Sequence, residues 1–333
     1  MQNLAATLAI SFVVSLVSTF LVMPFLIKKL KARGLVGKDM NKAGEPEVTE
    51  LGGTGVIFGF SFGLVAAIFS FTYLDLVELN LTVLLAAFLT ILLVGFIGVV
   101  DDLIGWKKGL RQYQHALMPL VAALPLMAVR AGTTEMAIPL LGTVGFGIFY
   151  SLILIPVGVT GASNAFNMLA GLNGFEAGQG IIILSAMSFI AFFAGQVEAT
   201  IIGVALVAAL LAFIFFNWFP AKVFGGDSLT LMIGASIATI SIIGNMEKIG
   251  VMMLALYFVE LIIKARTKFQ SECFGEIQKD GKLEPPKQKG SLTHYVMAWK
   301  RLTEKQVVLT IFALQAIVAV LVVFYSFFLT HLF

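Results

Sequence analysis

The chain contains apolar blocks that are each about 17–25 residues long, and they limit the fold more than any other feature. A helix rises about 1.5 Å per residue, so one such block can cross about 30 Å of hydrocarbon. Hydrophobic residues make up 59% of the 333 residues and charged residues only 12%. Inside hydrocarbon, blocks of this length satisfy their backbone groups as helices. We therefore predict an all-α polytopic membrane protein.

About ten transmembrane helices are expected. The first block, Leu4 to Ile27, is too long for a signal-peptide core and lacks a small-residue cleavage site, which favours a retained helix. The predicted spans are 4–27, 51–73, 82–100, 115–129, 145–163, 177–195, 199–218, 229–244, 249–265 and 306–331. Residues 1–333 would form a single membrane domain with an excursion at 266–305, where Asp280-Gly281 favours a turn and a small hairpin. Cys273 is the only cysteine, so no internal disulfide can form.

Charge is distributed unevenly over the connections between the predicted spans. Of the 22 lysine and arginine residues, 20 fall in the first, third, seventh and ninth connections, and only Arg130 and Lys248 lie on the opposite side. Because cytoplasmic connections carry the excess of Lys and Arg, the basic side is predicted to face the cytoplasm. Ten spans then place both termini outside.

Two adjacent carboxylates, Asp101 and Asp102, follow the third predicted span. At the C-terminal end of a helix the dipole disfavours a negative charge by roughly 0.3–1 kcal/mol. One interpretation is a solvated pair at the membrane interface. The other is a functional pair that acts as a general base or as the acids of a magnesium site, because hard cations prefer carboxylate oxygens.

A polar run, N-A-F-N-M-L-A-G-L-N-G-F-E, occupies residues 164–176 after the fifth predicted span. Asn164 and Asn167 are three residues apart and would share one helical face. A buried amide without a partner costs roughly 2–7 kcal/mol, so these side chains need partners. They could join neighbouring helices, but contact with a ligand or a metal ion is the interpretation that we prefer.

The segment F-G-G-D-S at residues 224–228 precedes the eighth predicted span. Asp227 or Ser228 would make an ordinary N-terminal cap. The two glycines would also let backbone N–H groups approach an anion at the positive end of the helix, where an acid could hold a metal ion that bridges phosphates. Lys264, Arg266 and Lys268 open the ninth connection and by themselves indicate contact with lipid headgroups. No role is predicted for His294 or His331, which lack partners at metal-ligand spacing.

Taken together, these segments resemble one family. The run N-A-F-N-M-L-A-G-L-N-G-F-E-A-G-Q (164–179) resembles the signature of the UDP-N-acetylglucosamine–dolichyl-phosphate N-acetylglucosamine-1-phosphotransferases. These form the eukaryotic and archaeal branch of the polyprenyl-phosphate N-acetylhexosamine-1-phosphate transferases. D-M-N-K (39–42), V-D-D-L-I-G-W-K-K-G-L (100–110), V-F-G-G-D-S (223–228) and D-G-K-L-E (280–284) fall in the same order as in the family.

The resemblance implies ten spans, a cytoplasmic active site and a magnesium-dependent transfer. In that reaction the phosphate of a dolichyl or other polyprenyl phosphate attacks the β-phosphorus of UDP-GlcNAc and releases UMP. By position, Asp101 and Asp102 would be the catalytic acids, and Asn167 and Asp227 would hold Mg²⁺, with Mn²⁺ as an alternative. The nucleotide would contact Phe224, Asn173, Gly171 and Met40. The residues assigned to phosphate or sugar are His115, Arg111, Arg266, Lys268, Asn164, Glu176 and Glu50.

Some positions depart from the family pattern. Ala170 and Asn173 stand where the bacterial members, including the muramoyl-pentapeptide transferase, have Asp, which argues against the peptidoglycan branch. His115 stands where the family usually has a lysine, so either it replaces that lysine or Arg111 or Lys108 reaches the phosphate. The ninth connection is shorter than in the eukaryotic enzyme and carries no ER-retention signal, which favours an archaeal cell membrane.

The partners implied are UDP-GlcNAc, the lipid phosphate, the bilayer and, as in other members of the family, a second copy of the chain; no nucleic acid is expected. An alternative within the class is transfer of another N-acetylhexosamine-1-phosphate for a cell-envelope polymer. A secondary transporter is the alternative from a different class. Transporters usually carry ionisable groups near the bilayer midplane, whereas the central thirds of the predicted spans have almost none.

Overall fold

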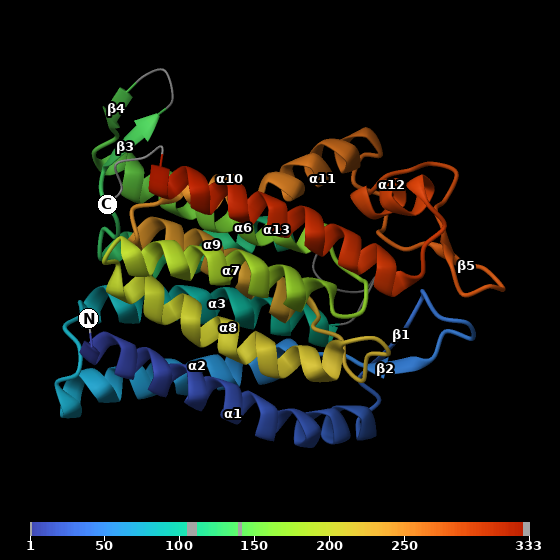
Figure 1. Cartoon of the computed structure of the whole chain (residues 1–333), viewed down its shortest axis with the longest axis horizontal. Coiled ribbons are helices and arrows are strands. Elements are labelled where there is room, and N and C mark those ends of the chain that lie inside the picture. The colour runs from blue at the N-terminus through green and yellow to red at the C-terminus, as the bar shows by residue number, and fades with distance from the viewer. Residues whose placement is uncertain (1, 105–111, 139–141, 329–333) are drawn as a thin grey trace.

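Long apolar helices run side by side along the longest axis of the molecule (Figure 1). The computed structural model describes residues 2–104, 112–138 and 142–328. The long segments are α1 (Gln2–Ala32), α2 (Gly53–Leu74), α3 (Leu81–Ile104), η1 (Tyr150–Leu154) continuing into α6 (Ile155–Met168), α7 (Phe175–Phe193), α8 (Val197–Asn217) and α13 (Glu304–Phe328). These seven are the helices, among the described residues, that are long and apolar enough to cross a membrane. The chain is thus an integral membrane protein of the polytopic helical class.

The other three predicted spans are also helical, but they are shorter or divided. They are α4 (Gln112–Ala122) with α5 (Leu124–Ala128), α9 (Asp227–Ile243), and α10 (Glu247–Met253) with α11 (Ala255–Arg266). Pro125 lies in the first turn of α5, and Pro156 follows the π-helical turn η1. Proline has no N–H to donate, which accounts for the break before α5 and for the change from π- to α-helix at the start of α6. The fifth span was predicted at 145–163, but its helix runs from Tyr150 to Met168 because strand β4 continues to Gly145.

Three short antiparallel hairpins complete the fold. β1 (Val36–Lys38) pairs with β2 (Glu47–Thr49), β3 (Glu135–Ile138) with β4 (Gly142–Gly145), and β5 (Glu276–Ile277) with β6 (Leu283–Glu284). The hairpin predicted within 266–305 is confirmed, and Gly281 in its turn has φ +74°. That region also forms helix α12 (Leu292–Trp299), which was not predicted.

The connections are divided between the two ends of the bundle. The two termini and the β3–β4 hairpin lie at one end, whereas β1, β2, β5 and α12 lie at the other (Figure 1). This arrangement agrees with the prediction that successive connections lie on alternate sides of the membrane. It gathers the basic first and ninth connections at one end.

α9 lies in the centre of the bundle. It contacts α2, α3, α6, α7, α8 and α10, and nearly all of its side chains are buried. Since its neighbours are protein rather than lipid, α9 does not need the length of an ordinary membrane span.

α1 and α2 pack closely because small residues face each other. Three glycines one turn apart, Gly55, Gly59 and Gly63, form this face of α2. A Cβ atom on Gly59 would collide with the Thr19 hydroxyl and lie 2.9 Å from the Ser15 carbonyl oxygen. The Ser11 hydroxyl donates to the carbonyl of Gly63 at 2.9 Å. Small residues that let helix backbones approach are the usual basis of helix association in lipid.

This packing predicts that Gly59→Leu destabilises the protein. Overpacking a tight interface typically costs about 1–3 kcal/mol, and α1 cannot move without losing its contacts to α8. Gly158→Leu in α6 is the matched control, because nothing lies within 4 Å of a Cβ built there. Thermal unfolding in detergent should show a clear loss for Gly59→Leu alone; equal stability of the two variants would contradict the packing argument.

Candidate active site

A cavity of about 1080 Å³ lies at the end of the bundle opposite the two termini. The first connection (residues 34–40), the ends of α3 and α6, the loop before α9 and residues 271–274 line it. The predicted site residues on its walls are Met40, Glu50, Asp101, Asp102, Asn167, Gly171, Glu176, Phe224 and Asp227. Segments far apart in the sequence thus converge as predicted.

Asp102 binds the N-terminus of α9. Its Oδ1 accepts from the backbone N–H of Asp227 at 2.8 Å, and its Oδ2 accepts from the N–H and hydroxyl of Ser228 at 3.1 and 2.8 Å. The close approach of α3 and α9 requires a glycine from each. A Cβ on Gly98 of α3 would lie 2.5 Å from the Asp227 carbonyl oxygen, and Gly226, which precedes α9, has φ +73°. The negative end of the α3 dipole disfavours the charge of Asp102, and the positive end of the α9 dipole offsets this effect. These contacts let Asp102 position α9, and its predicted role as a catalytic acid stays a prediction.

Asn167 and Asp227 approach each other through Thr230. The Thr230 hydroxyl is 3.1 Å from Asn167 Oδ1 and 3.3 Å from the Asp227 backbone carbonyl oxygen. These contacts join the last turn of α6 to the first turn of α9. Asn167 and Asp227 both line the cavity beside this junction.

Glu50 adds a further carboxylate to this region. Burial raises the pKa of Glu50 above its usual value, and the negative charge of Asp227 raises it further. The repulsion between these two negative charges would be reduced by a cation bound beside them.

The oxygen donors fit Mg²⁺ if a substrate phosphate completes the coordination. Among the described residues, no three His, Cys, Asp or Glu side chains are grouped closely enough to hold a metal ion by themselves. Mg²⁺ commonly binds through one or two carboxylates together with substrate phosphates rather than in an all-protein cage. Asp227 and Asn167 are such a partial set.

Phe224 lines the cavity, and its backbone is fixed by two hydrogen bonds. The Phe224 N–H donates to Thr49 O, and the Phe224 carbonyl accepts from Gly52 N–H, both at 2.8 Å. A Cβ on Gly52 would lie 2.6 Å from that carbonyl oxygen. Phe274, also on the wall, packs its ring against Gly171, which has φ +108°. Both rings belong to the cavity lining.

Two predicted amides do not line the cavity. Asn173 is 2% exposed; its Nδ2 donates to Asp39 Oδ2 at 3.1 Å, and its Oδ1 accepts from the Ala221 N–H at 2.8 Å. Asn164 donates to the carbonyls of Ala116 and Thr160, so it joins α4 to α6. Their side chains are used within the protein, as in the helix-packing interpretation.

The cation of the ninth connection that reaches the cavity is Lys264. It lines the wall and its Nζ lies 3.7 Å from Glu260 Oε1, whereas Arg266 and Lys268 are exposed and do not line the wall. Position alone could not separate these three neighbours, because the direction of each side chain depends on where α11 ends. Arg111 and Lys108 lie outside the described residues, as does the side chain of His115, and their roles stay predictions.

A buried ion network was missed by sequence reasoning. Lys42 Nζ lies 3.2 Å from Asp39 Oδ2 and also pairs with Glu304, whose Oε1 accepts from the Asn173 N–H at 2.8 Å. The network ties the first connection to the loop before α7 and to α13. Asp39 and Lys42 belong to the D-M-N-K segment, which was noticed, but nothing marked Glu304 as their partner. Lys38 and residues 271–274 on the cavity wall were also missed.

Comparison with known proteins identifies the family. The profile of glycosyl transferase family 4 matches residues 84–245. A Saccharolobus solfataricus protein is 39% identical over 316 residues, which cover 94% of each chain. The chain belongs to glycosyl transferase family 4. The resemblance stated from the sequence is thus confirmed.

The family 4 relatives differ in their names. The Saccharolobus protein and one from Sulfolobus acidocaldarius, 36% identical over 95% of this chain and 94% of the relative, are provisionally named UDP-N-acetylglucosamine–dolichyl-phosphate N-acetylglucosaminephosphotransferases. A Halalkalibacterium halodurans protein, 34% identical over 78% of this chain and 80% of the relative, is named phospho-N-acetylmuramoyl-pentapeptide-transferase. Both names describe transfer of a sugar phosphate.

The contacts of Asp102 predict that Asp102→Asn lowers stability even without substrate. The amide replaces one acceptor oxygen with an N–H₂ group that faces backbone donors, and an unsatisfied buried donor costs about 1–3 kcal/mol. Thermal unfolding of the ligand-free protein measures this loss. Asp75→Asn is the control, because Asp75 is exposed at the opposite end of α2 in a left-handed conformation that Asn tolerates. Equal unfolding temperatures would contradict the positioning role.

Proposed function

We propose that this chain transfers GlcNAc-1-phosphate from UDP-GlcNAc to a dolichyl or other polyprenyl phosphate and releases UMP, as the first lipid-linked step of N-glycan assembly. One observation carries the proposal: Asp101, Asn167, Phe224 and Asp227 line one cavity at the end of a membrane bundle. The archaeal relatives with this name match along almost the whole chain, which supports the same donor and acceptor.

The acceptor phosphate is the nucleophile. A phosphate monoester has a second pKa near 6, so at pH 7 its oxygen needs little deprotonation. The chain must instead align it with the β-phosphorus of the donor and balance the charge of three phosphates. Asp101 lines the same cavity as Asn167 and Asp227, and we assign the orientation of the acceptor to it.

Mg²⁺ would neutralise the diphosphate, and Asp227 and Asn167 would hold it. Lys264 contributes a positive charge to the cavity wall, and Phe224 offers a face for the uracil ring. Catalysis of phosphoryl transfer rests mainly on such positioning and charge stabilisation.

We also propose that ten segments cross the membrane and that the cavity faces the cytoplasm of an archaeal cell. The excess of Lys and Arg in the connections at the cavity end supports this orientation. The homodimer implied by the family stays a prediction.

The function is tested by measuring UMP release by purified protein with polyprenyl phosphate, Mg²⁺ and a panel of UDP-sugars. Highest turnover with UDP-GlcNAc is expected. Higher turnover with another UDP-N-acetylhexosamine would favour the cell-envelope alternative, and no UMP from any donor would reject the proposal.

Asp227→Asn should lower the rate of UMP release by at least about 10²-fold, the scale of losing one positioned electrostatic group. Asp280→Asn is the control, because Asp280 lies on the exposed β5–β6 hairpin and pairs there with Lys282 and Arg301. A higher Mg²⁺ concentration should partly restore the Asp227→Asn rate. Near-normal turnover of this variant would remove Asp227 from the site.

Lys264→Gln should reduce kcat/KM for UDP-GlcNAc by about 10-fold or more, on the scale of a charge-assisted contact to phosphate. Arg266→Gln removes the same charge two residues away from an exposed position and should change kcat/KM less than about twofold. Lys264→Arg keeps the charge and should retain more activity than Lys264→Gln. Equal losses at positions 264 and 266 would show that only the overall charge matters.

A further inference from the structure

Residues 271–274 form one wall of the cavity, and we call them the wall segment. They belong to a connection rather than to a helix, so their position must be fixed by contacts from elsewhere. The ring of Phe274 lies against Gly171, where a Cβ would approach the ring to 2.6 Å. The wall segment therefore contacts the polar run 164–176, to which Gly171 belongs.

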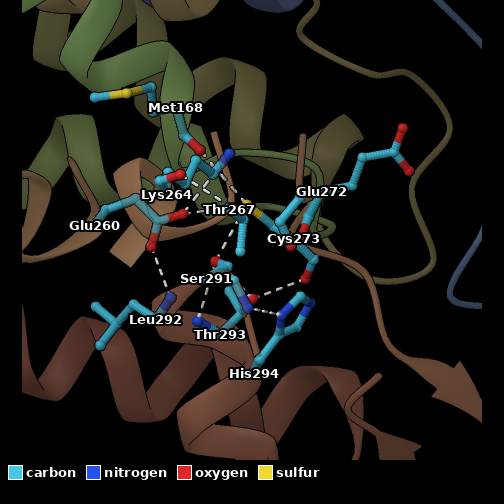
Figure 2. A network of polar contacts seen from close by, with 12 residues as sticks. Met168, Glu260, Lys264, Thr267, Glu272, Cys273, Ser291, Leu292, Thr293 and His294 are labelled. Atoms are coloured by element: carbon cyan, nitrogen blue, oxygen red, sulfur yellow. Dashed lines mark hydrogen bonds and ion pairs between the residues drawn. The ribbon is translucent and has the colours of Figure 1, made fainter. Parts of the chain in front are cut away.

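Helix α12 holds the backbone of the wall segment. The Thr293 hydroxyl lies 2.8 Å from the carbonyl oxygen of Cys273 (Figure 2), and His294 Nε2 lies 2.8 Å from the carbonyl oxygen of Phe274. Ser291 caps α12 by accepting from the Thr293 N–H, and its hydroxyl donates to Cys273 Sγ at 3.4 Å. Two consecutive carbonyls and the side chain of Cys273 are thus bound by three residues at one end of α12.

The hydrogen bonds of His294 define its protonation. Nδ1 lies 3.1 Å from the backbone nitrogen of Gly290, which can only donate, so Nδ1 is an acceptor. Nε2 faces a carbonyl oxygen and must carry the proton. The ring is therefore neutral. Burial lowers the pKa of His294, and the nearby positive charge of Lys264 lowers it further, which agrees with this state.

Glu260 joins the same contacts to the cavity. Its Oε2 accepts from the Leu292 N–H at 2.6 Å, and its Oε1 faces Lys264 Nζ at 3.7 Å and Cys273 Sγ at 3.8 Å (Figure 2). Cys273 Sγ also lies 3.5 Å from the carbonyl of Met168, the residue after Asn167. The wall segment is thus connected both to the cavity cation and to the end of α6.

We propose that Thr293 and His294 are positioning residues that hold the wall segment and thereby set the affinity of the cavity for the nucleotide sugar. Neither residue lines the cavity, so their effect is exerted through the carbonyls of Cys273 and Phe274. The two hydrogen bonds go to backbone carbonyls of the wall segment and not to the acidic and amide side chains of α3, α6 and α9. The inference rests on the proposed function for its kinetic consequence, but not for its structural one.

The kinetic test compares pairs of variants. Thr293→Val removes the hydroxyl at constant shape, and Thr293→Ser restores it; His294→Ala removes both ring contacts, and His294→Gln can still donate to the Phe274 carbonyl. We expect Thr293→Val and His294→Ala to raise KM for UDP-GlcNAc about 10-fold while kcat changes less than about threefold. The Ser and Gln variants should remain within about threefold of the wild type in KM.

A second test needs no activity. Cys273 is the only cysteine, it is 4% exposed, and burial raises the pKa of its thiol, so alkylation by N-ethylmaleimide should be slow. Thr293→Val and His294→Ala should increase the alkylation rate at least about 10-fold at fixed pH. Tyr295→Ala, an exposed truncation on the same helix, is the control and should leave both alkylation and KM unchanged.

The outcomes separate the two proposals. If the wild type releases no UMP from any UDP-sugar, the proposed function fails. Faster alkylation of Thr293→Val and His294→Ala would still support the positioning role of Thr293 and His294. Unchanged alkylation and unchanged KM in both variants would overturn this positioning role, as would a loss of kcat with unchanged KM. If Thr293→Val does not fold, the comparison of His294→Gln with His294→Ala decides.

Discussion

The carboxylate of Asp102 accepts three hydrogen bonds from the first two residues of α9, and the geometry of the site depends on this contact. It fixes the depth of α9 against the end of α3. Because Asp227 begins α9 and Thr230 lies about one turn further, the same contact determines where both project, and through Thr230 it reaches Asn167 on α6. Charge-assisted hydrogen bonds of this kind are stronger and more directional than neutral ones, which suits a junction of three helices.

This junction is feasible because α9 is enclosed by other helices. A helix of 17 residues is about 25 Å long, less than the thickness of the hydrocarbon. In lipid, its exposed N-terminal backbone groups would be costly, but irregular backbone at membrane depth is tolerated where it lines a cavity or is buried in protein. The residues before α9 do both: Gly225 and Gly226 line the cavity, and the carbonyls of Phe224 and Gly225 accept hydrogen bonds from the start of α2.

The sequence was most informative where one physical demand dominated. Apolar blocks predicted a helix at each of the ten places, because hydrocarbon permits little else, and the polar motifs at helix ends predicted most of the cavity wall. The sequence was least informative where the same side-chain group could bind either a ligand or another part of the protein. Asn173 carries the same amide whether it binds a nucleotide or Asp39. Lys264 and Arg266 both carry a positive charge, but only Lys264 lines the cavity. His294 seemed to have no partner because its partners are backbone groups, which no residue pattern reveals.

The cavity consists of two parts, one inside and one outside the range that the family profile matches. The profile of family 4 matches residues 84–245, which include Asp101, Asp102, Asn167, Phe224 and Asp227, all on helix ends or beside them. The first connection, the wall segment and its support on α12 lie outside that range. Relatives whose names specify different sugar phosphates match this chain at 34–39% identity. Under the proposed function, the helix ends would hold the diphosphate and the walls built from connections would contact the rest of the donor, so that the donor could change while the geometry of the phosphates stays the same.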